Sequence, residues 1–175
     1  MKKFLIVVDM QNDFVDGALG SAEASAIVPA VADEISAFDG EIIATFDTHS
    51  EDYLSTSEGK NLPVEHCIKG TKGWLLNEKV QASLNEKGFT ALEKPTFGSV
   101  KLPQLIKEKA GDEEFTVELI GLCTDICVVS NALLLKANFP EAEITVKPSC
   151  CAGVSPETHN AALATMRCCH IKTEE

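Results

Sequence analysis

Residues 115–127 read FTVELIGLCTDIC, and this stretch predicts the fold more directly than any other part of the chain. Its first half, Phe115–Ile120, is an apolar and β-branched run of the length of a strand. A helical pattern then begins at Asp125, almost without a loop between the two. A buried strand that leads straight into a helix is typical of a sheet whose strands are joined by helices.

The same order recurs along the rest of the chain. Other short apolar runs, continuous as expected of strands covered on both faces, are Phe4–Val8, Ile42–Phe46, Phe89–Leu92 and Ile144–Val146. Segments with helical spacing are Ala26–Phe38, Leu75–Glu86, Leu102–Lys109, Asp125–Asn138 and Pro156–Cys168. His170–Lys172 is a candidate for a short sixth strand. The alternation predicts an α/β fold, a parallel sheet with helices on both faces. The segment Asp47–Gly73 is irregular and long enough to imply a function.

Composition narrows the classes of function. The chain has 175 residues, 45% of them hydrophobic and 24% charged, which predicts a single globular domain over residues 1–175. Its formal charge of −12 argues against nucleic acid and anionic membranes as partners. No apolar run approaches the roughly 18 residues of a transmembrane helix. Asp9 and Asp13 interrupt the N-terminal apolar run too early for a signal peptide, so we expect a cytoplasmic protein.

The seven cysteines predict reduced thiols rather than a disulfide framework. Their number is odd, and two pairs are adjacent in sequence. No CxxC pair is present, which excludes a zinc ribbon or a thioredoxin-type motif. Packing is the default role of the thiols other than Cys123 and Cys127. His159 and His170 are expected on the surface of a helix and in a strand, and neither is assigned a role.

Three strand ends carry groups with complementary chemistry. Asp9 follows the first strand, Lys94 the third, and Cys123 and Cys127 follow the fourth. Sites in doubly wound sheets form beyond the carboxyl ends of the strands, so these groups share one rim. A thiol in the first turn of a helix beside an ammonium favours the thiolate, and a carboxylate can accept and return its proton. Each residue alone is as readily a loop cap, a surface lysine or core filler; the joint placement favours chemistry.

The chain also resembles the isochorismatase-like cysteine hydrolases, and within that superfamily the nicotinamidases most closely. Six motifs in register carry the resemblance over nearly the whole chain, namely DMQNDF at 9–14, TFDTH at 45–49, PVEHCIKGT at 63–71, KPTF at 94–97, GLCTDICV at 121–128, and CAG at 151–153 leading to His159 and Ala162-Leu163. Any one of these alone would be a weak signal. The set in order is specific.

The resemblance implies a three-layer α/β/α Rossmann-like fold with a six-stranded parallel sheet. It assigns Cys127 as the nucleophile, Asp9 as proton acceptor and donor, and Lys94 as the electrostatic partner of both. It also implies a cis peptide bond before Cys123, with the N–H groups of Cys123 and Cys127 as an oxyanion hole. Family members without a cysteine at position 127 do different chemistry, so this chain is expected to hydrolyse amides.

The irregular segment carries a second constellation: Asp47, His49, Glu58 and His66. Asp-x-His places a carboxylate and an imidazole on one side of an extended segment, and later residues can fold back to complete a divalent site. Nicotinamidases carry a metal here. Asp47, His49 and His66 match the family directly, whereas Tyr53 stands where many members have a histidine, and Glu58 is its best replacement. We expect one divalent metal, zinc first, with iron or manganese as alternatives. In the other interpretation, His49 and His66 only hydrogen-bond the loop.

These features predict a cysteine amidohydrolase that converts nicotinamide to nicotinate and ammonia through a thioester on Cys127. Phe14 resembles one aromatic wall of the nicotinamidase substrate site, and Leu62 replaces a tryptophan of the opposite wall, which predicts a weakened KM. The alternatives are an amidase for another small amide or carbamoyl compound, and a catalytically silent metal-binding relative. Relatives often form dimers or tetramers, and the sequence selects no homo-oligomer among these.

Overall fold

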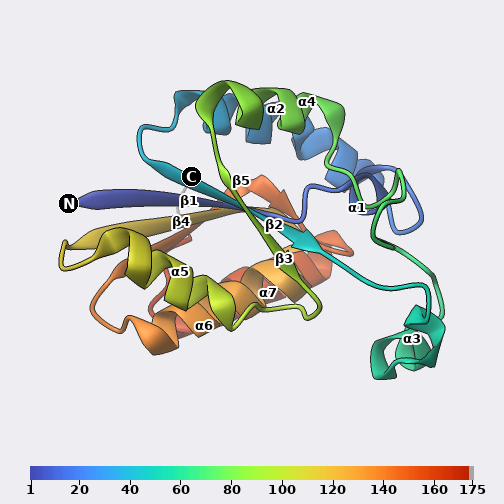
Figure 1. Ribbon diagram of the computed structural model, residues 1–175. Helices are drawn as coiled ribbons and strands as arrows, with labels where there is room; N and C mark the ends of the chain where they lie inside the picture. The colour runs from blue at the N-terminus through green and yellow to red at the C-terminus, as the bar shows by residue number, and fades with distance from the viewer. Residues whose placement is uncertain (174–175) are drawn as a thin grey trace.

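The computed structural model describes residues 1–173 and shows a parallel sheet between two layers of helices (Figure 1). The strands are β1 (Lys2–Val8), β2 (Glu41–Asp47), β3 (Thr90–Lys94), β4 (Phe115–Leu122) and β5 (Glu143–Ala152). They pair in the order β3-β2-β1-β4-β5, and every neighbouring pair is parallel. The predicted α/β class and three-layer arrangement are confirmed.

The predicted six-stranded sheet is wrong for the described residues, in which the sheet has five strands. The segment His170–Lys172 forms a single parallel bridge, between Thr145 and Lys172. Lys172 bonds through its backbone to Ile144 and Val146, but His170 has a φ of 61°. That left-handed residue turns the chain after the last helix, so only a short piece comes into register with β5.

Helices cover both faces of the sheet. The helices α1 (Asn12–Val15), α2 (Ala22–Ala37) and α4 (Glu78–Lys87) lie on one side, and α5 (Lys101–Ala110), α6 (Val129–Asn138) and α7 (Pro156–Cys168) lie on the other (Figure 1). Along β1, Leu5 and Val7 belong to the core under α2 and α4, whereas Phe4, Ile6 and Val8 belong to the opposite core. This explains the continuous apolar run, because both faces of the strand are buried.

Two segments differ from the helices expected from sequence. The expected helix Asp125–Asn138 is divided into a π-helical turn, η2 (Thr124–Val128), and the α-helix α6. The irregular segment after β2 contains a 3₁₀ turn, η1 (Tyr53–Ser55), and a short helix, α3 (Ser57–Asn61). Together η1 and α3 form an arm that projects from the body (Figure 1). The side chain of Thr56 caps α3 by accepting from Gly59 N. In residues 1–173, no helix has the length and apolar character needed to cross a membrane.

Candidate active site and metal centre

The sheet places Asp9, Lys94 and Cys127 together in a buried group. Lys94 lies at the end of β3, and its Nζ is 2.6 Å from Asp9 Oδ2 and 3.5 Å from Cys127 Sγ. The exposed fractions of the three residues are 0% for Asp9, 1% for Lys94 and 4% for Cys127. Asp9 has a φ of 47°, and its backbone N–H donates to Thr45 O on β2 at 3.2 Å. The strand ends therefore meet at one rim, as the sequence predicts.

Thr45 is a member of this group that sequence reasoning missed. Its hydroxyl donates to Asp9 Oδ1 at 2.6 Å, and it is fully buried in β2. The residue stands in the quoted motif at 45–49, where it is a polar side chain in an otherwise apolar run. A polar residue in a buried strand next to a motif was the signal that could have identified Thr45. Thr45 and Lys94 together bond both oxygens of the Asp9 carboxylate and so fix its orientation.

The ionisation of the group differs from the sequence prediction. Burial raises the pKa of the Cys127 thiol well above its usual value; the charge of Asp9 adds to this, and Lys94 opposes it. Burial also raises the pKa of Asp9, against the opposing effects of Lys94 and Thr45. Burial alone would lower the pKa of Lys94, but Asp9, Cys127 and Asp47 raise it overall. These directions oppose the thiolate expected from the sequence, because burial favours the protonated form of the Cys127 thiol in the free protein.

The turn that carries Cys127 begins with an unusual backbone. The peptide bond between Leu122 and Cys123 is cis, as the resemblance implies. The carbonyl oxygen of Cys123 accepts from the N–H groups of Ile126 and Val128 at 3.1 and 3.0 Å. Gly121 precedes the turn with a φ of 114°, and a Cβ there would lie 2.2 Å from Val8 O on β1. The close packing of β4 on β1 thus requires glycine immediately before the turn.

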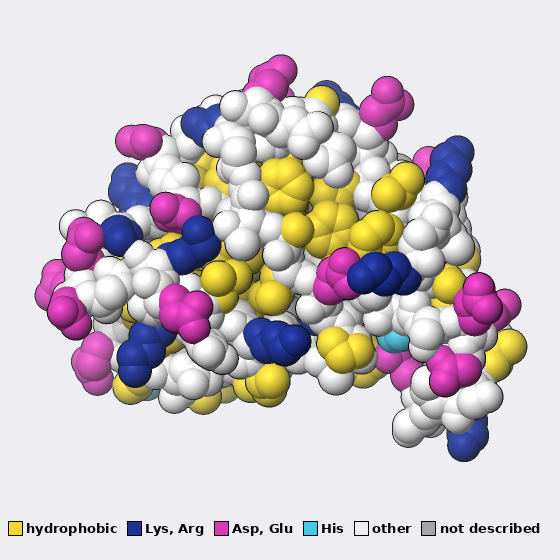
Figure 2. All heavy atoms as spheres, in the orientation of Figure 1, with side chains coloured by type: hydrophobic (Ala, Val, Ile, Leu, Met, Phe, Trp, Pro, Cys, Tyr) yellow, Lys and Arg dark blue, Asp and Glu magenta, His cyan; other side chains and the backbone are white. Residues whose placement is uncertain are grey.

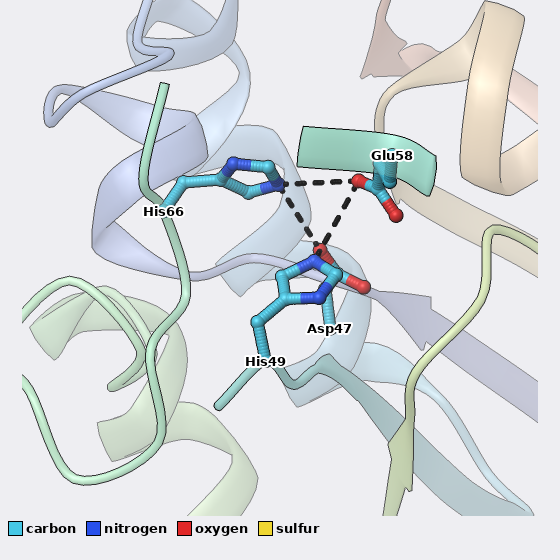
Figure 3. A group of neighbouring side chains, drawn as sticks. All are labelled: Asp47, His49, Glu58 and His66. Carbon is cyan, nitrogen blue, oxygen red and sulfur yellow. Dashed lines mark hydrogen bonds and ion pairs between the residues drawn. The ribbon is translucent and has the colours of Figure 1, made fainter. Parts of the chain in front are cut away.

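The second constellation is also assembled. Asp47, His49, Glu58 and His66 each turn one ligand atom toward a common centre, and these atoms all lie within 4.8 Å of one another (Figure 3). His49 Nε2 is 3.0 Å from Asp47 Oδ2 and 3.6 Å from Glu58 Oε1. His66 Nε2 is 3.5 and 3.6 Å from the same two oxygens. Glu58, which projects from α3, takes the fourth position that the sequence analysis gave it.

Neighbouring groups prepare this cluster for a cation. His66 Nδ1 donates to Val64 O at 2.8 Å, which leaves the Nε2 lone pair facing the cluster. Tyr53 packs against both imidazoles of the cluster. Its ring centroid lies 4.7 Å from that of His49 and 5.0 Å from that of His66. Burial tends to raise the pKa of Asp47, but its contacts with the His49 and His66 rings and the charge of Lys94 lower it overall. Two imidazoles and two carboxylates form a donor set suited to a divalent transition metal.

Gln11 is a second positioning residue that the sequence analysis did not identify. It is fully buried at the end of β1, and its side-chain oxygen accepts from Asp47 N at 2.8 Å. Its side-chain nitrogen donates to Asp47 O and to Trp74 O, each at 2.8 Å. The amide therefore pairs with both backbone groups of Asp47 and holds that ligand in place. Lys94 Nζ also lies 3.5 Å from Asp47 Oδ1, so the two constellations are directly connected.

A cavity of about 700 Å³ opens between the arm and the loop after β3. Its wall includes His49 and Glu58 of the cluster, and it reaches Thr96 and Ile126, which are close in sequence to Lys94 and Cys127. Leu62, the candidate substrate-wall residue, lines this cavity together with Phe97, which sequence reasoning gave no role. Phe14 is not among the residues that line this cavity, and its ring contacts His66 at a centroid distance of 5.5 Å. Figure 2 shows only a small patch of histidine surface where the arm meets the body.

Known proteins share this architecture. Residues 3–175 match the family model described as the isochorismatase domain. A nicotinamidase/pyrazinamidase of Mycobacterium tuberculosis is 28% identical, with 96% of each chain covered. The crystal structure of a nicotinamidase/pyrazinamidase from Bacillus subtilis is 26% identical with a TM-score of 0.86, and both chains are fully covered. A pyrazinamidase of Pyrococcus horikoshii, solved in complex with zinc, is 26% identical with a TM-score of 0.81, covering 100% of this chain and 99% of that one. The chain belongs to the isochorismatase family of hydrolases.

Proposed function

We propose that this protein is a cysteine amidohydrolase that converts nicotinamide to nicotinate and ammonia. The observation that supports it most strongly is the position of Lys94, whose Nζ lies 2.6 Å from Asp9 and 3.5 Å from Cys127 in a buried site. A carboxylate, an ammonium and a thiol in contact are the parts that nucleophilic acyl transfer requires. Relatives similar along their whole length are named nicotinamidase and pyrazinamidase.

In the first half of the reaction, Cys127 Sγ attacks the carboxamide carbon. The thiol proton passes to Asp9 as the sulfur attacks. The N–H groups of Cys123 and Cys127 would hold the oxyanion. Asp9 then gives the proton to the amide nitrogen, the C–N bond breaks, ammonia leaves, and a thioester remains on Cys127.

In the second half, a water molecule attacks the thioester carbon while Asp9 accepts its proton. The C–S bond breaks, the acid is released, and Asp9 returns the proton to the sulfur of Cys127. Each turnover consumes one amide and one water and releases one carboxylic acid and one ammonia. Lys94 stays protonated throughout, because its raised pKa keeps the ammonium charged beside Asp9.

Asp47, His49, Glu58 and His66 would hold one divalent metal, and we propose zinc, with iron or manganese as alternatives. The mixed nitrogen and oxygen donor set fits each of them. A metal bound there would supply a Lewis acid able to coordinate the pyridine nitrogen of the substrate. Leu62 and Phe97 would pack against the ring, and Phe14 would support it from the side of His66.

Ammonia release from a panel of small amides tests the proposal. Nicotinamide, an aliphatic amide and a carbamoyl compound are assayed with the metal-loaded protein, and again after chelation and reloading. We expect nicotinamide to be hydrolysed, activity to fall on chelation and return on reloading, and iodoacetamide to abolish it. If only an aliphatic amide or a carbamoyl compound is hydrolysed, nicotinamide is not the substrate and that compound class takes its place. If no amide gives ammonia release that iodoacetamide abolishes, the protein is a catalytically silent metal-binding relative.

A further inference from the structure

The segment that carries Cys127 is held from outside as well as by its own hydrogen bonds. The turn η2 is π-helical, a form that is rare and usually limited to a single turn. Within it, the carbonyl oxygen of Cys123 is shared by the N–H groups of Ile126 and Val128. A backbone held by shared bonds of this kind is less constrained than a regular α-helix, so contacts from neighbouring elements help to set the direction of the Cys127 side chain.

Two such contacts come from residues 153–159, which comprise the loop after β5 and the first turn of α7. Thr124 is fully buried, and its Oγ1 lies 2.8 Å from His159 Nδ1 on α7. A buried hydroxyl needs a hydrogen-bond partner, and His159 supplies one. The next residue, Asp125, accepts from Val154 N through both carboxylate oxygens, at 3.2 and 3.1 Å. Both residues at the start of the turn are therefore bonded to the same neighbouring segment.

That neighbouring segment is itself well fixed. The helix α7 begins with a capping box formed by Ser155 and Thr158, with Pro156 at its start. The backbone of Gly153 packs closely against His159, since a Cβ at position 153 would lie 2.9 Å from His159 N. Burial lowers the pKa of His159, although Asp125 opposes the shift, so the ring is neutral at neutral pH. A neutral ring can accept the Thr124 hydroxyl at Nδ1.

We propose that His159 is a positioning residue for the hydrolytic reaction, which acts through Thr124 to hold the turn that carries Cys127. His159 is not one of the four clustered residues Asp47, His49, Glu58 and His66, and it lies on α7, in the helix layer opposite α2 and α4. The inference rests on the proposed function, in which Cys127 is the nucleophile and nicotinamide is the substrate. Because a displacement of about 1 Å at a reacting atom can reduce a rate by around a hundredfold, one hydrogen bond at this place is sufficient to control catalysis.

Kinetics of two pairs of variants test the proposal. Thr124→Val and His159→Leu remove the hydrogen bond, whereas Thr124→Ser and His159→Asn keep a polar atom near the same place. We expect kcat for nicotinamide to fall about 10- to 100-fold in the first pair, with KM changed less than threefold, and to return to within about threefold of wild type in the second. The double variant Thr124→Val/His159→Leu should be no slower than the slower single variant, because both remove one interaction.

A second measurement needs no turnover. The rate of alkylation of Cys127 by iodoacetamide is followed by peptide mass spectrometry, which separates this cysteine from the others. Thr124→Val and His159→Leu should change the rate of Cys127 alkylation about tenfold relative to wild type, because they release the turn that holds the buried thiol, and Thr124→Ser should react at the wild-type rate. If the wild type does not hydrolyse nicotinamide, the proposed substrate is wrong, and alkylation alone decides whether His159 positions the thiol.

Thr165→Val is the matched control, because Thr165 also lies on α7 but its hydroxyl donates to Ala161 O on the surface. It should change neither rate. The proposal is overturned if Thr124→Val and His159→Leu lower the melting temperature but keep kcat and the alkylation rate of wild type. It is also overturned if the rate losses of the two single variants multiply in the double variant.

Discussion

The Lys94 ammonium contacts three acidic groups: the Asp9 carboxylate, the Cys127 thiol and the Asp47 carboxylate. It thus joins the triad to the metal cluster through a single side chain. Its charge balances carboxylates that are buried and would otherwise be unpaired. At this scale the chemistry depends on where the mobile proton lies: burial raises the pKa of both Cys127 and Asp9, and the Lys94 charge opposes the shift in each.

The two cysteines of the η2 region should therefore respond differently to mutation. Cys127→Ala removes the nucleophile but keeps the contact of Asp9 with Lys94, so we expect a folded protein with at least a thousandfold lower turnover. Cys123→Ala keeps the backbone N–H at position 123 and should lose less than about tenfold. Ammonia release, with melting temperatures as the control for folding, separates the two. Equal losses in both variants would argue against Cys127 as the nucleophile.

Glu58 is the proposed metal ligand with the least support in sequence, because the family resemblance points to position 53, where this chain has Tyr53. Its Oε1 lies 3.6 Å from both His49 Nε2 and His66 Nε2. Glu58→Gln removes the charge but keeps the size, and we expect it to weaken zinc binding at least tenfold in competition with a chromophoric chelator. Glu51→Gln, in the same loop but exposed, should bind zinc as wild type does. Equal affinity in the two variants would remove Glu58 from the metal site.

The grouping of Asp9, Lys94 and Cys127, and the clustering of Asp47, His49 and His66, could be predicted from sequence because these residues stand in ordered motifs. The protonation state of the Cys127 thiol could not be predicted from the sequence. A helix start and a lysine both favour a thiolate, whereas burial and Asp9 act in the other direction, and the degree of burial appears only once the chain is folded. Thr45 and Gln11 were missed for a related reason, because each acts through a hydrogen bond to a residue far along the chain. Thr45 bonds the Asp9 carboxylate, and Gln11 bonds the backbone of Asp47.

At the scale of elements, most strands and helices follow the apolar pattern, and α7 has the predicted bounds Pro156–Cys168. The differences occur where hydrogen bonding, rather than hydrophobic spacing, determines the type or the bounds of an element. Residues 124–128 have the apolar spacing of the helix that follows, yet bonds to Cys123 O make them a π-helical turn. Likewise η1 and α3 are too short to show a period, and capping by Thr56 determines where α3 begins.

Gly121 on β4 should tolerate a side chain less well than Gly88, which follows α4. Gly121→Ala places a methyl group 2.2 Å from Val8 O in addition to the cost of a φ of 114°, whereas Gly88→Ala has the left-handed φ of 78° but open space around it. We expect about 1–2 kcal/mol of lost unfolding free energy for Gly88→Ala and at least twice that for Gly121→Ala, measured in urea. Similar losses would mean that the close approach of β4 to β1 is relaxed at little cost.

Glu118 on β4 should make stability depend on pH. Burial raises its pKa above the ordinary value of 4.5, Glu34 adds to the shift, and Lys147 opposes it. One of its oxygens, Oε1, is buried without a hydrogen-bond partner among residues 1–173. A carboxyl whose pKa is raised on folding stabilises the fold below its unfolded-state pKa, and this contribution is lost as the pH rises through the folded-state pKa. The ionised form at neutral pH is therefore the unfavourable one.

Glu118→Gln should accordingly raise the melting temperature at pH 7.5 by about 2–4 °C, the change that roughly 1 kcal/mol produces in a chain of this size. The difference from wild type should shrink as the pH approaches 4.5. Scanning calorimetry at several pH values measures it, with the exposed Glu114→Gln as the control. A gain that is the same at every pH, or no gain at all, would count against a raised pKa of Glu118.

At the scale of the whole molecule, the strand order brings the site together. The first strand lies between β2 and β4, and the chain runs outward from it in both directions. Asp9 follows β1, Lys94 and Asp47 end β3 and β2, and the turn η2 after β4 supplies Cys127. The general position of the site at the carboxyl edge was predictable from this class of fold. The direction of the arm and the shape of the cavity were not, because they depend on packing of Tyr53 and Glu58 against side chains of other segments.

The claim central to this account is that the amide is cleaved through a thioester on Cys127, and trapping with hydroxylamine tests it most directly. A thioester reacts with hydroxylamine to give a hydroxamate, whereas direct attack of water on the amide gives only the acid. We predict that the wild-type protein with nicotinamide and hydroxylamine forms nicotinohydroxamate at the expense of nicotinate, and that Cys127→Ala forms neither. Formation of nicotinate by Cys127→Ala at a rate comparable to wild type would contradict the account.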